Sequence, residues 1–232
     1  MSRNILYIHG LQSSGKSRTA DIIRREIPEA NVYSPDIPVS AKEAYAFIDK
    51  FRIDHNIDLI IGTSMGGMLA QKMRGIPKIL VNPSFHVSES MRKKIGIVPF
   101  YRERDDGSTE YEITEQMCDE FAELEATQFR HLSGSEVACT FGVFGNNDDV
   151  VNCKDEYLQH YSNVKFINGG HRLSEDNIVN EIVPLIRYIY SPAFNKKITD
   201  AGVADLQRHM AEFEERWKDT PQGIKDGFFQ GD

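Results

Sequence analysis

Residues 58–73, DLIIGTSMGGMLAQKM, carry the clearest structural signal in the chain. An apolar run ends in the pattern G-x-S-x-G at Gly62, Ser64 and Gly66, and apolar side chains then recur at helical spacing. This order predicts a strand, a sharp turn and a helix, the context in which G-x-S-x-G exposes a reactive serine. The turn strains the serine backbone and brings strand and helix too close for β-carbons, which is why glycines flank the serine. We expect Ser64 to be a nucleophile; an inert serine in a glycine-rich turn is the alternative.

Six short β-like runs recur along the chain, and most are apolar throughout, as expected for parallel strands covered on both faces. They are residues 4–10, 31–37, 57–64, 77–84, 138–147 and 163–170. Helical patterns separate most of them, such as the stripe that contains Ala44, Ile48 and Phe51. This alternation predicts an α/β fold with a doubly wound, mainly parallel six-stranded sheet. Ligands of such sheets bind at the carboxyl ends of the strands.

A nucleophilic serine needs a base, and the base needs an acid to orient it. In this architecture the acid and then the histidine follow the serine along the chain. Asp148 and Asp149 come directly after the fifth run, and His171 follows the sixth run after two glycines. We therefore predict a triad of Ser64, Asp148 and His171. Asp149 competes for the acid role, and a solvated turn is the alternative interpretation of the two aspartates.

Acyl transfer also requires an oxyanion hole, in which two backbone N–H groups point at the developing negative charge. One donor is expected from the residue after the nucleophile, Met65, and the other from the loop after the first strand. That loop begins His9-Gly10-Leu11-Gln12. The second donor is predicted to be the N–H of Leu11, with Gln12 as the alternative.

The same loop fits a phosphate-binding pattern, because residues 10–17, GLQSSGKS, match G-x-x-x-x-G-K-S between a strand and a helix. A phosphate-loop enzyme also needs an acidic residue, usually at the end of another strand, to help hold Mg²⁺. Most of the other runs end without one, and Asp148 is already accounted for by the triad. We therefore interpret the loop as an oxyanion loop, with Ser13 or Ser14 as the N-cap of the next helix.

Two segments depart from the alternation of strands and helices. Residues 100–135 are polar and partly helical, and we interpret them as a cap insertion over the site; a solvated surface excursion is the alternative. The tail after Pro192 repeats apolar residues at spacings of three and four, too briefly for a coiled coil. These residues are Val203, Leu206, Met210, Phe213 and Trp217. A helix docked on the body is favoured, and a homodimer contact is the alternative.

Composition limits the classes of function. The chain has 232 residues, 40% apolar content, a formal charge of −8 and a pI near 5.4. These values favour one α/β domain and argue against a nucleic-acid or anionic-membrane surface. The N-terminal apolar run at residues 5–8 is too short for a signal peptide or a membrane span. Cys118, Cys139 and Cys153 lack paired spacing, which predicts free thiols and a cytoplasmic location.

The motifs together resemble the small α/β-hydrolase family of esterase-like bacterial proteins known as the YqiA/YcfP group. The matching stretches are YIHGLQSSGKSRTA at 7–20, GTSMGG at 62–67, VNPS at 81–84, GNNDDVV at 145–151 and GGHR at 169–172. The resemblance covers about residues 3–190. It implies Ser64 as nucleophile, Asp148 as acid and His171 as base, on a truncated sheet with strand order 2-1-3-4-5-6. Residues 100–135 match only loosely, and the tail from about 193 goes beyond the family.

The sequence therefore predicts an α/β-hydrolase domain over residues 1–192 and a C-terminal helical extension over residues 193–232. The predicted activity is that of a serine esterase or thioesterase that cleaves a small acyl ester or thioester through an acyl-enzyme intermediate. No metal or cofactor is implied. The alternatives are a nucleotide-binding protein that uses residues 10–17 and a non-catalytic binding protein on a hydrolase scaffold.

Overall fold

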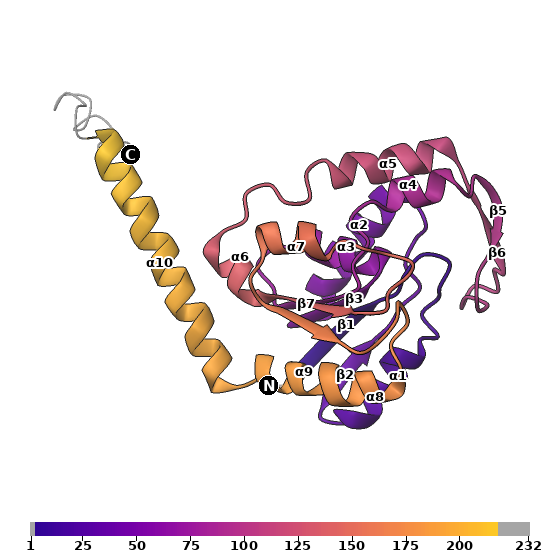
Figure 1. Ribbon diagram of the computed structural model, residues 1–232, viewed down its shortest axis with the longest axis horizontal. Coiled ribbons are helices and arrows are strands. Elements are labelled where there is room, and N and C mark those ends of the chain that lie inside the picture. The colour runs from indigo at the N-terminus through magenta and orange to yellow at the C-terminus, as the bar shows by residue number, and fades with distance from the viewer. Residues whose placement is uncertain (1–2, 218–232) are drawn as a thin grey trace.

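The computed structural model describes residues 3–217 and is built around a six-stranded sheet (Figure 1). The strand order is β2-β1-β3-β4-β7-β8, and every neighbouring pair is parallel. The strands are β1 (Arg3–Ile8), β2 (Ala30–Tyr33), β3 (Leu59–Thr63), β4 (Lys78–Val81), β7 (Thr140–Gly145) and β8 (Val164–Ile167). The fifth and sixth predicted runs are β7 and β8, so the predicted order 2-1-3-4-5-6 is confirmed.

Helices cover both faces of the sheet, which explains why its strands are apolar throughout. In β1, Leu6 and Ile8 pack into the core on one face, while Ile5 and Tyr7 pack into the core on the other. The first core is closed by α2 (Ala41–Asp54), α3 (Met65–Lys72) and α7 (Lys154–His160). The second is closed by α1 (Arg18–Glu26), a π-helical turn (Ile178–Ile182) and α9 (Val183–Ile189) (Figure 1). The short helix α8 (Glu175–Asn177) leads into the π-helical turn and buries none of its residues.

The segment between β4 and β7 contains a hairpin that the sequence did not predict. After α4 (Val87–Arg92), strands β5 (Gly96–Pro99) and β6 (Glu110–Ile113) pair in antiparallel fashion, separate from the main sheet. Helices α5 (Glu115–Glu125) and α6 (Gly134–Cys139) then lead back to β7, and α5 packs on α4 (Figure 1). The insertion is therefore a hairpin followed by helices rather than helices alone.

The C-terminal helix α10 (Pro192–Trp217) projects away from the body (Figure 1). Its first turns are anchored, since Phe194 is buried and Asp205 accepts hydrogen bonds from the N–H groups of Gly134 and Ser135 at 3.0 and 2.8 Å. The predicted docking through the apolar repeat is wrong for the described side chains. Val203, Leu206 and Met210 are 49%, 60% and 55% exposed. The side chains of Phe213 and Trp217 lie outside the described residues.

Candidate active site

The turn between β3 and α3 holds Ser64 in a strained conformation, as predicted from G-x-S-x-G. Its backbone has φ 58° and ψ −122°, a region that residues with a side chain rarely adopt. The two flanking glycines are required because a β-carbon at either position would clash with the backbone. A β-carbon on Gly62 would lie 2.1 Å from the carbonyl oxygen of Gly66, and one on Gly66 would lie 2.2 Å from that of Ile8. The strand, the turn and the helix therefore fit together only with glycine at both positions.

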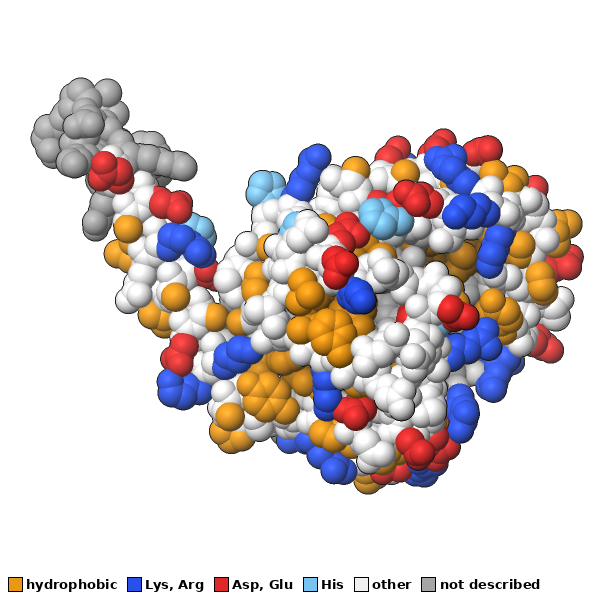
Figure 2. All heavy atoms as spheres, in the orientation of Figure 1, with side chains coloured by type: hydrophobic (Ala, Val, Ile, Leu, Met, Phe, Trp, Pro, Cys, Tyr) orange, Lys and Arg blue, Asp and Glu red, His pale blue; other side chains and the backbone are white. Residues whose placement is uncertain are grey.

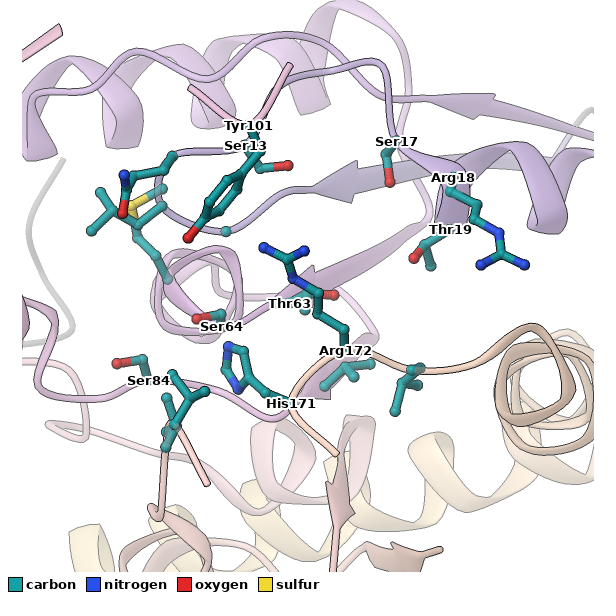
Figure 3. A pocket seen from close by; sticks show the side chains of 18 of the residues that line it. Ser13, Ser17, Arg18, Thr19, Thr63, Ser64, Ser84, Tyr101, His171 and Arg172 are labelled. Carbon is teal, nitrogen blue, oxygen red and sulfur yellow. The ribbon is translucent and has the colours of Figure 1, made fainter. Parts of the chain in front are cut away.

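Ser64 opens into a cavity of about 760 Å³ at the carboxyl ends of the strands. His171, Leu11 and Met65 line the same cavity, so the structure brings these predicted site residues together. Figure 3 shows the imidazole of His171 beside the side chain of Ser64, on the strand-end side of the cavity. Within residues 3–217, no hydrogen bond joins the Ser64 hydroxyl to this ring. Catalytic hydrogen bonds are often long in a site without substrate.

His171 is paired with Asp148 and not with Asp149. The His171 Nδ1 atom lies 2.9 Å from Oδ2 of Asp148, whose side chain is only 5% exposed. The other carboxylate oxygen, Oδ1, accepts from the N–H groups of Val150 and Val151, both at 2.9 Å. Asp149 is exposed and lines the cavity wall. A buried carboxylate with fixed partners is the group that can orient the imidazole.

Asn82, which follows β4, holds the loops of the histidine and the aspartate together, and sequence reasoning missed it. Its side-chain N–H₂ donates to the carbonyl oxygens of Gly170 and His171, both at 3.0 Å. Its side-chain oxygen accepts from the N–H of Gly145 at 2.8 Å. Asn82 is 1% exposed and has a φ of 43°, a conformation that asparagine tolerates well. The only signal in the sequence was its place at a strand end, in the stretch VNPS.

The N–H groups of Leu11 and Met65, the predicted oxyanion donors, donate no hydrogen bond to another group among the described residues. His9 shapes the loop that carries Leu11. Its Nε2 atom accepts from the N–H of Ile37 at 3.1 Å, so the ring must carry its proton on Nδ1, which donates to the Gly10 carbonyl at 2.9 Å. Burial lowers the pKa of His9 below its usual value, which keeps the ring neutral.

Gln12 ties the same loop to the hairpin insertion. Its backbone carbonyl accepts from the N–H of Tyr101 at 2.8 Å. Its side chain donates to the carbonyl of Pro99 at 3.1 Å and accepts from Nζ of Lys94 at 3.0 Å. Gln12 has a φ of 61°, so these bonds hold the backbone in a left-handed conformation directly after Leu11.

The phosphate-binding pattern does not form a phosphate cradle. The N–H of Gly15 donates to Oδ1 of Asp36 at 2.6 Å, so a carboxylate of the protein occupies the place that a phosphate oxygen would need. The Lys16 ammonium turns to the hairpin insertion, 3.4 Å from the carbonyl oxygen of Arg104. The predicted N-cap at Ser13 or Ser14 is wrong, because the Ser17 hydroxyl accepts from the N–H of Ala20 and begins α1.

Within residues 3–217, no group of three or more His, Cys, Asp and Glu side chains is placed to hold a metal ion. No helix in the same part of the chain combines the length and apolar character needed to cross a bilayer.

The model of a family described as "Uncharacterised protein family (UPF0227)" matches residues 4–188. A structure from a study of LipS and LipT, two metagenome-derived lipolytic enzymes, is 13% identical with a TM-score of 0.58, covering 84% of this chain and 94% of that one. Alpha/beta hydrolase domain-containing protein 10 from mouse is 13% identical with a TM-score of 0.57, covering 82% and 90%. The esterase domain of a Rhodothermus marinus protein is 16% identical with a TM-score of 0.56, covering 81% and 86%. The chain belongs to the UPF0227 family, and its fold is that of the α/β hydrolases.

Proposed function

We propose that this protein is a serine hydrolase that cleaves an ester or thioester of a small molecule. One arrangement carries the proposal: a strained Ser64 shares a cavity with His171, and His171 is held by a buried Asp148. Ser64 acts as the nucleophile, His171 as the general base and acid, and Asp148 as the group that orients the imidazole. These roles rest on the geometry and on the order of the three residues along the chain.

The reaction proceeds in two stages. With Nδ1–H bonded to Asp148, Nε2 of His171 takes the proton of Ser64 as Oγ attacks the carbonyl carbon of the substrate. The negative charge on the former carbonyl oxygen is stabilised by the N–H groups of Leu11 and Met65. His171 then protonates the leaving group, and the acyl-enzyme remains. A water molecule, deprotonated by His171, attacks the acyl carbon and releases the acid, and the proton returns to Ser64.

The comparisons support this class of reaction by analogy, because the similar structures include proteins described as lipolytic enzymes and an esterase domain. At these sequence identities the likeness concerns the fold, and a fold hosts many functions. A non-catalytic binding protein is therefore the competing hypothesis. The cysteines at 118, 139 and 153 are buried and unpaired, which fits the predicted cytoplasmic location.

The decisive experiment is intact mass spectrometry after incubation with a fluorophosphonate probe. We expect one adduct on the unaltered protein and none on Ser64→Ala. Ser84→Ala is the matched control, because Ser84 lines the same cavity and should leave labelling in place. An unaltered protein without an adduct would contradict an activated Ser64. ATP binding, with Lys16→Ala as its control, would then be the next measurement.

A further inference from the structure

The cavity that holds Ser64 is lined by many more basic than acidic side chains. Among the described residues that line it, Asp149 carries the only carboxylate. The basic residues are Lys16, Arg18, Lys94, Arg102 and Arg172. The whole chain carries a formal charge of −8, so this excess of positive charge is local and opposite in sign to the rest of the molecule.

Two of these cations are already matched by carboxylates outside the cavity lining. The guanidinium of Arg18 lies 2.9 Å from Glu175, and the ammonium of Lys16 lies 3.7 Å from Asp105. Both can be explained by the surface ion pairs that they make. Neither is therefore evidence for a ligand.

The other three cations have no carboxylate partner among residues 3–217. Lys94 donates to the side-chain oxygen of Gln12 at 3.0 Å, and Arg102 donates to the carbonyl oxygen of Lys16 at 2.9 Å. Arg172 makes no hydrogen bond to the part of the chain that the structure describes. All of its N–H donors are unused, and a guanidinium stays charged at any physiological pH.

Arg172 is exposed, and its guanidinium contacts the ring of Tyr101, which is itself 58% exposed. Arg172 directly follows His171 in the chain, and its Cζ atom lies 4.6 Å from the ring centroid of Tyr101, which comes from the hairpin insertion. Figure 3 shows the guanidinium of Arg172 among the side chains that line the cavity, near Tyr101 and Thr63. A guanidinium over an aromatic ring is attracted to it by a cation–π interaction, and its N–H groups remain free to donate to a ligand.

We propose that Arg172, supported by Tyr101, forms an anion subsite that binds a carboxylate or phosphate group of the substrate. A planar guanidinium with free N–H groups matches both anions, which it can bind through two parallel hydrogen bonds. Lys94 and Arg102 add favourable charge at longer range. The net negative charge of the chain favours a small-molecule anion over a nucleic acid. The effect on substrate turnover rests on the proposed function of Ser64. The binding of an anion at Arg172 does not depend on that function.

The kinetic test compares neutral esters with anionic esters of related structure. Methyl 4-acetoxybenzoate is compared with 4-acetoxybenzoate and with 4-acetoxyphenyl phosphate, which place a carboxylate or a phosphate on the leaving group. Dimethyl adipate is compared with monomethyl adipate, which places a carboxylate on the acyl group. In at least one pair, Arg172→Gln should lower the ratio of kcat/KM for the anionic ester to that for the neutral ester by about tenfold or more. Arg172→Lys should lose less.

Arg92→Gln is the matched control, because Arg92 is an exposed arginine that pairs with Glu115 and Asp119 away from the cavity. Arg92→Gln should have the same ratios of kcat/KM, anionic ester to neutral ester, as the unaltered protein. A ratio that Arg172→Gln leaves unchanged in all pairs would overturn the proposal. The pair that responds tells whether carboxylate or phosphate is preferred and whether the charge lies on the acyl or the leaving side.

A binding experiment separates this proposal from the proposed function. Calorimetry with Ser64→Ala should detect at least one of 4-hydroxybenzoate, 4-hydroxyphenyl phosphate and adipate, and Ser64→Ala with Arg172→Gln should bind it about tenfold or more weakly. If no ester is turned over but this difference is found, the anion subsite stands and the hydrolase proposal falls. If esters are turned over but neither binding nor this ratio of kcat/KM depends on Arg172, the subsite is refuted.

Discussion

At the scale of single residues, Asn82 bonds to the backbone of the loop that carries His171 and to the end of β7, which precedes Asp148. Asn82→Asp keeps the oxygen that accepts from Gly145 but removes the donor to the carbonyls of Gly170 and His171. We expect kcat for a neutral ester to fall by roughly 10- to 100-fold, because small displacements of catalytic groups are costly. Stability should fall by about 1–3 kcal/mol.

The measurement is kcat, KM and urea unfolding of Asn82→Asp beside Asn180→Asp, which makes the same change at an exposed position. Asn180→Asp should behave like the unaltered protein. If Asn82→Asp lost stability at full kcat, Asn82 would hold the fold without positioning His171.

His9 gives a prediction about pH at the same scale. Burial lowers its pKa in the folded state, whereas the unfolded chain keeps a value near 6.5. Above pH 6.5 both states are neutral, and as the pH falls below 6.5 the unfolded state takes up the proton first, so stability is lost. The slope of one such group is at most about 1.4 kcal/mol per pH unit.

Urea unfolding between about pH 5 and pH 8 should show this loss, and His9→Gln should flatten it. His209→Gln is the control, because His209 is exposed on α10. If His9→Gln lost the same free energy of unfolding between pH 8 and pH 5 as the unaltered protein, the pH dependence would come from groups other than His9.

At the scale of elements, the hairpin of β5 and β6 fixes the loop that carries Leu11 through Gln12. Gln12→Gly keeps the freedom to adopt a φ of 61° but removes the bonds to Pro99 and Lys94. We expect kcat to fall by about tenfold, less than the loss of an entire oxyanion donor. Steady-state kinetics would test this, with Lys94→Met as the variant that removes one bond alone. If Gln12→Gly and the unaltered protein had the same kcat, the bonds between Gln12 and the hairpin insertion would not contribute to catalysis.

The same elements explain what the sequence could predict. The main strands were recognisable because both of their faces are buried, as Leu6 and Tyr7 illustrate, and an uninterrupted apolar run records that burial. The hairpin strands are four residues long and carry exposed side chains such as Ile97, which is 69% exposed. β6 alternates polar and apolar residues, but over only four residues, which is the shortest run that can indicate a strand. Asn82 was missed because its partners Gly170 and His171 lie 88 and 89 residues away, where local patterns give no information.

At the scale of the whole molecule, the apolar repeat of α10 was recognised, but its surroundings were not. Spacing fixes which side chains share a helix face and says nothing about what covers that face. The anchor of α10 combines the buried Phe194 with a polar contact, in which Asp205 accepts from the first N–H groups of α6. The described side chains of the repeat, Val203, Leu206 and Met210, are exposed, and hydrophobic side chains are visible along the projecting helix in Figure 2.

A homodimer contact through this repeat, the alternative interpretation of its sequence, stays a prediction, and the exposed side chains make it testable. If two copies of the chain pair through α10, Leu206 and Met210 become buried, and each stabilises the dimer by about 1.5–3 kcal/mol. Leu206→Glu or Met210→Glu should then weaken association by roughly tenfold or more, as measured by sedimentation velocity over a range of concentrations. Gln207→Glu adds the same charge at an exposed position outside the repeat and should associate like the unaltered protein. An unaltered chain that sediments as a monomer at every concentration would contradict the dimer, since the repeat would then remain in water.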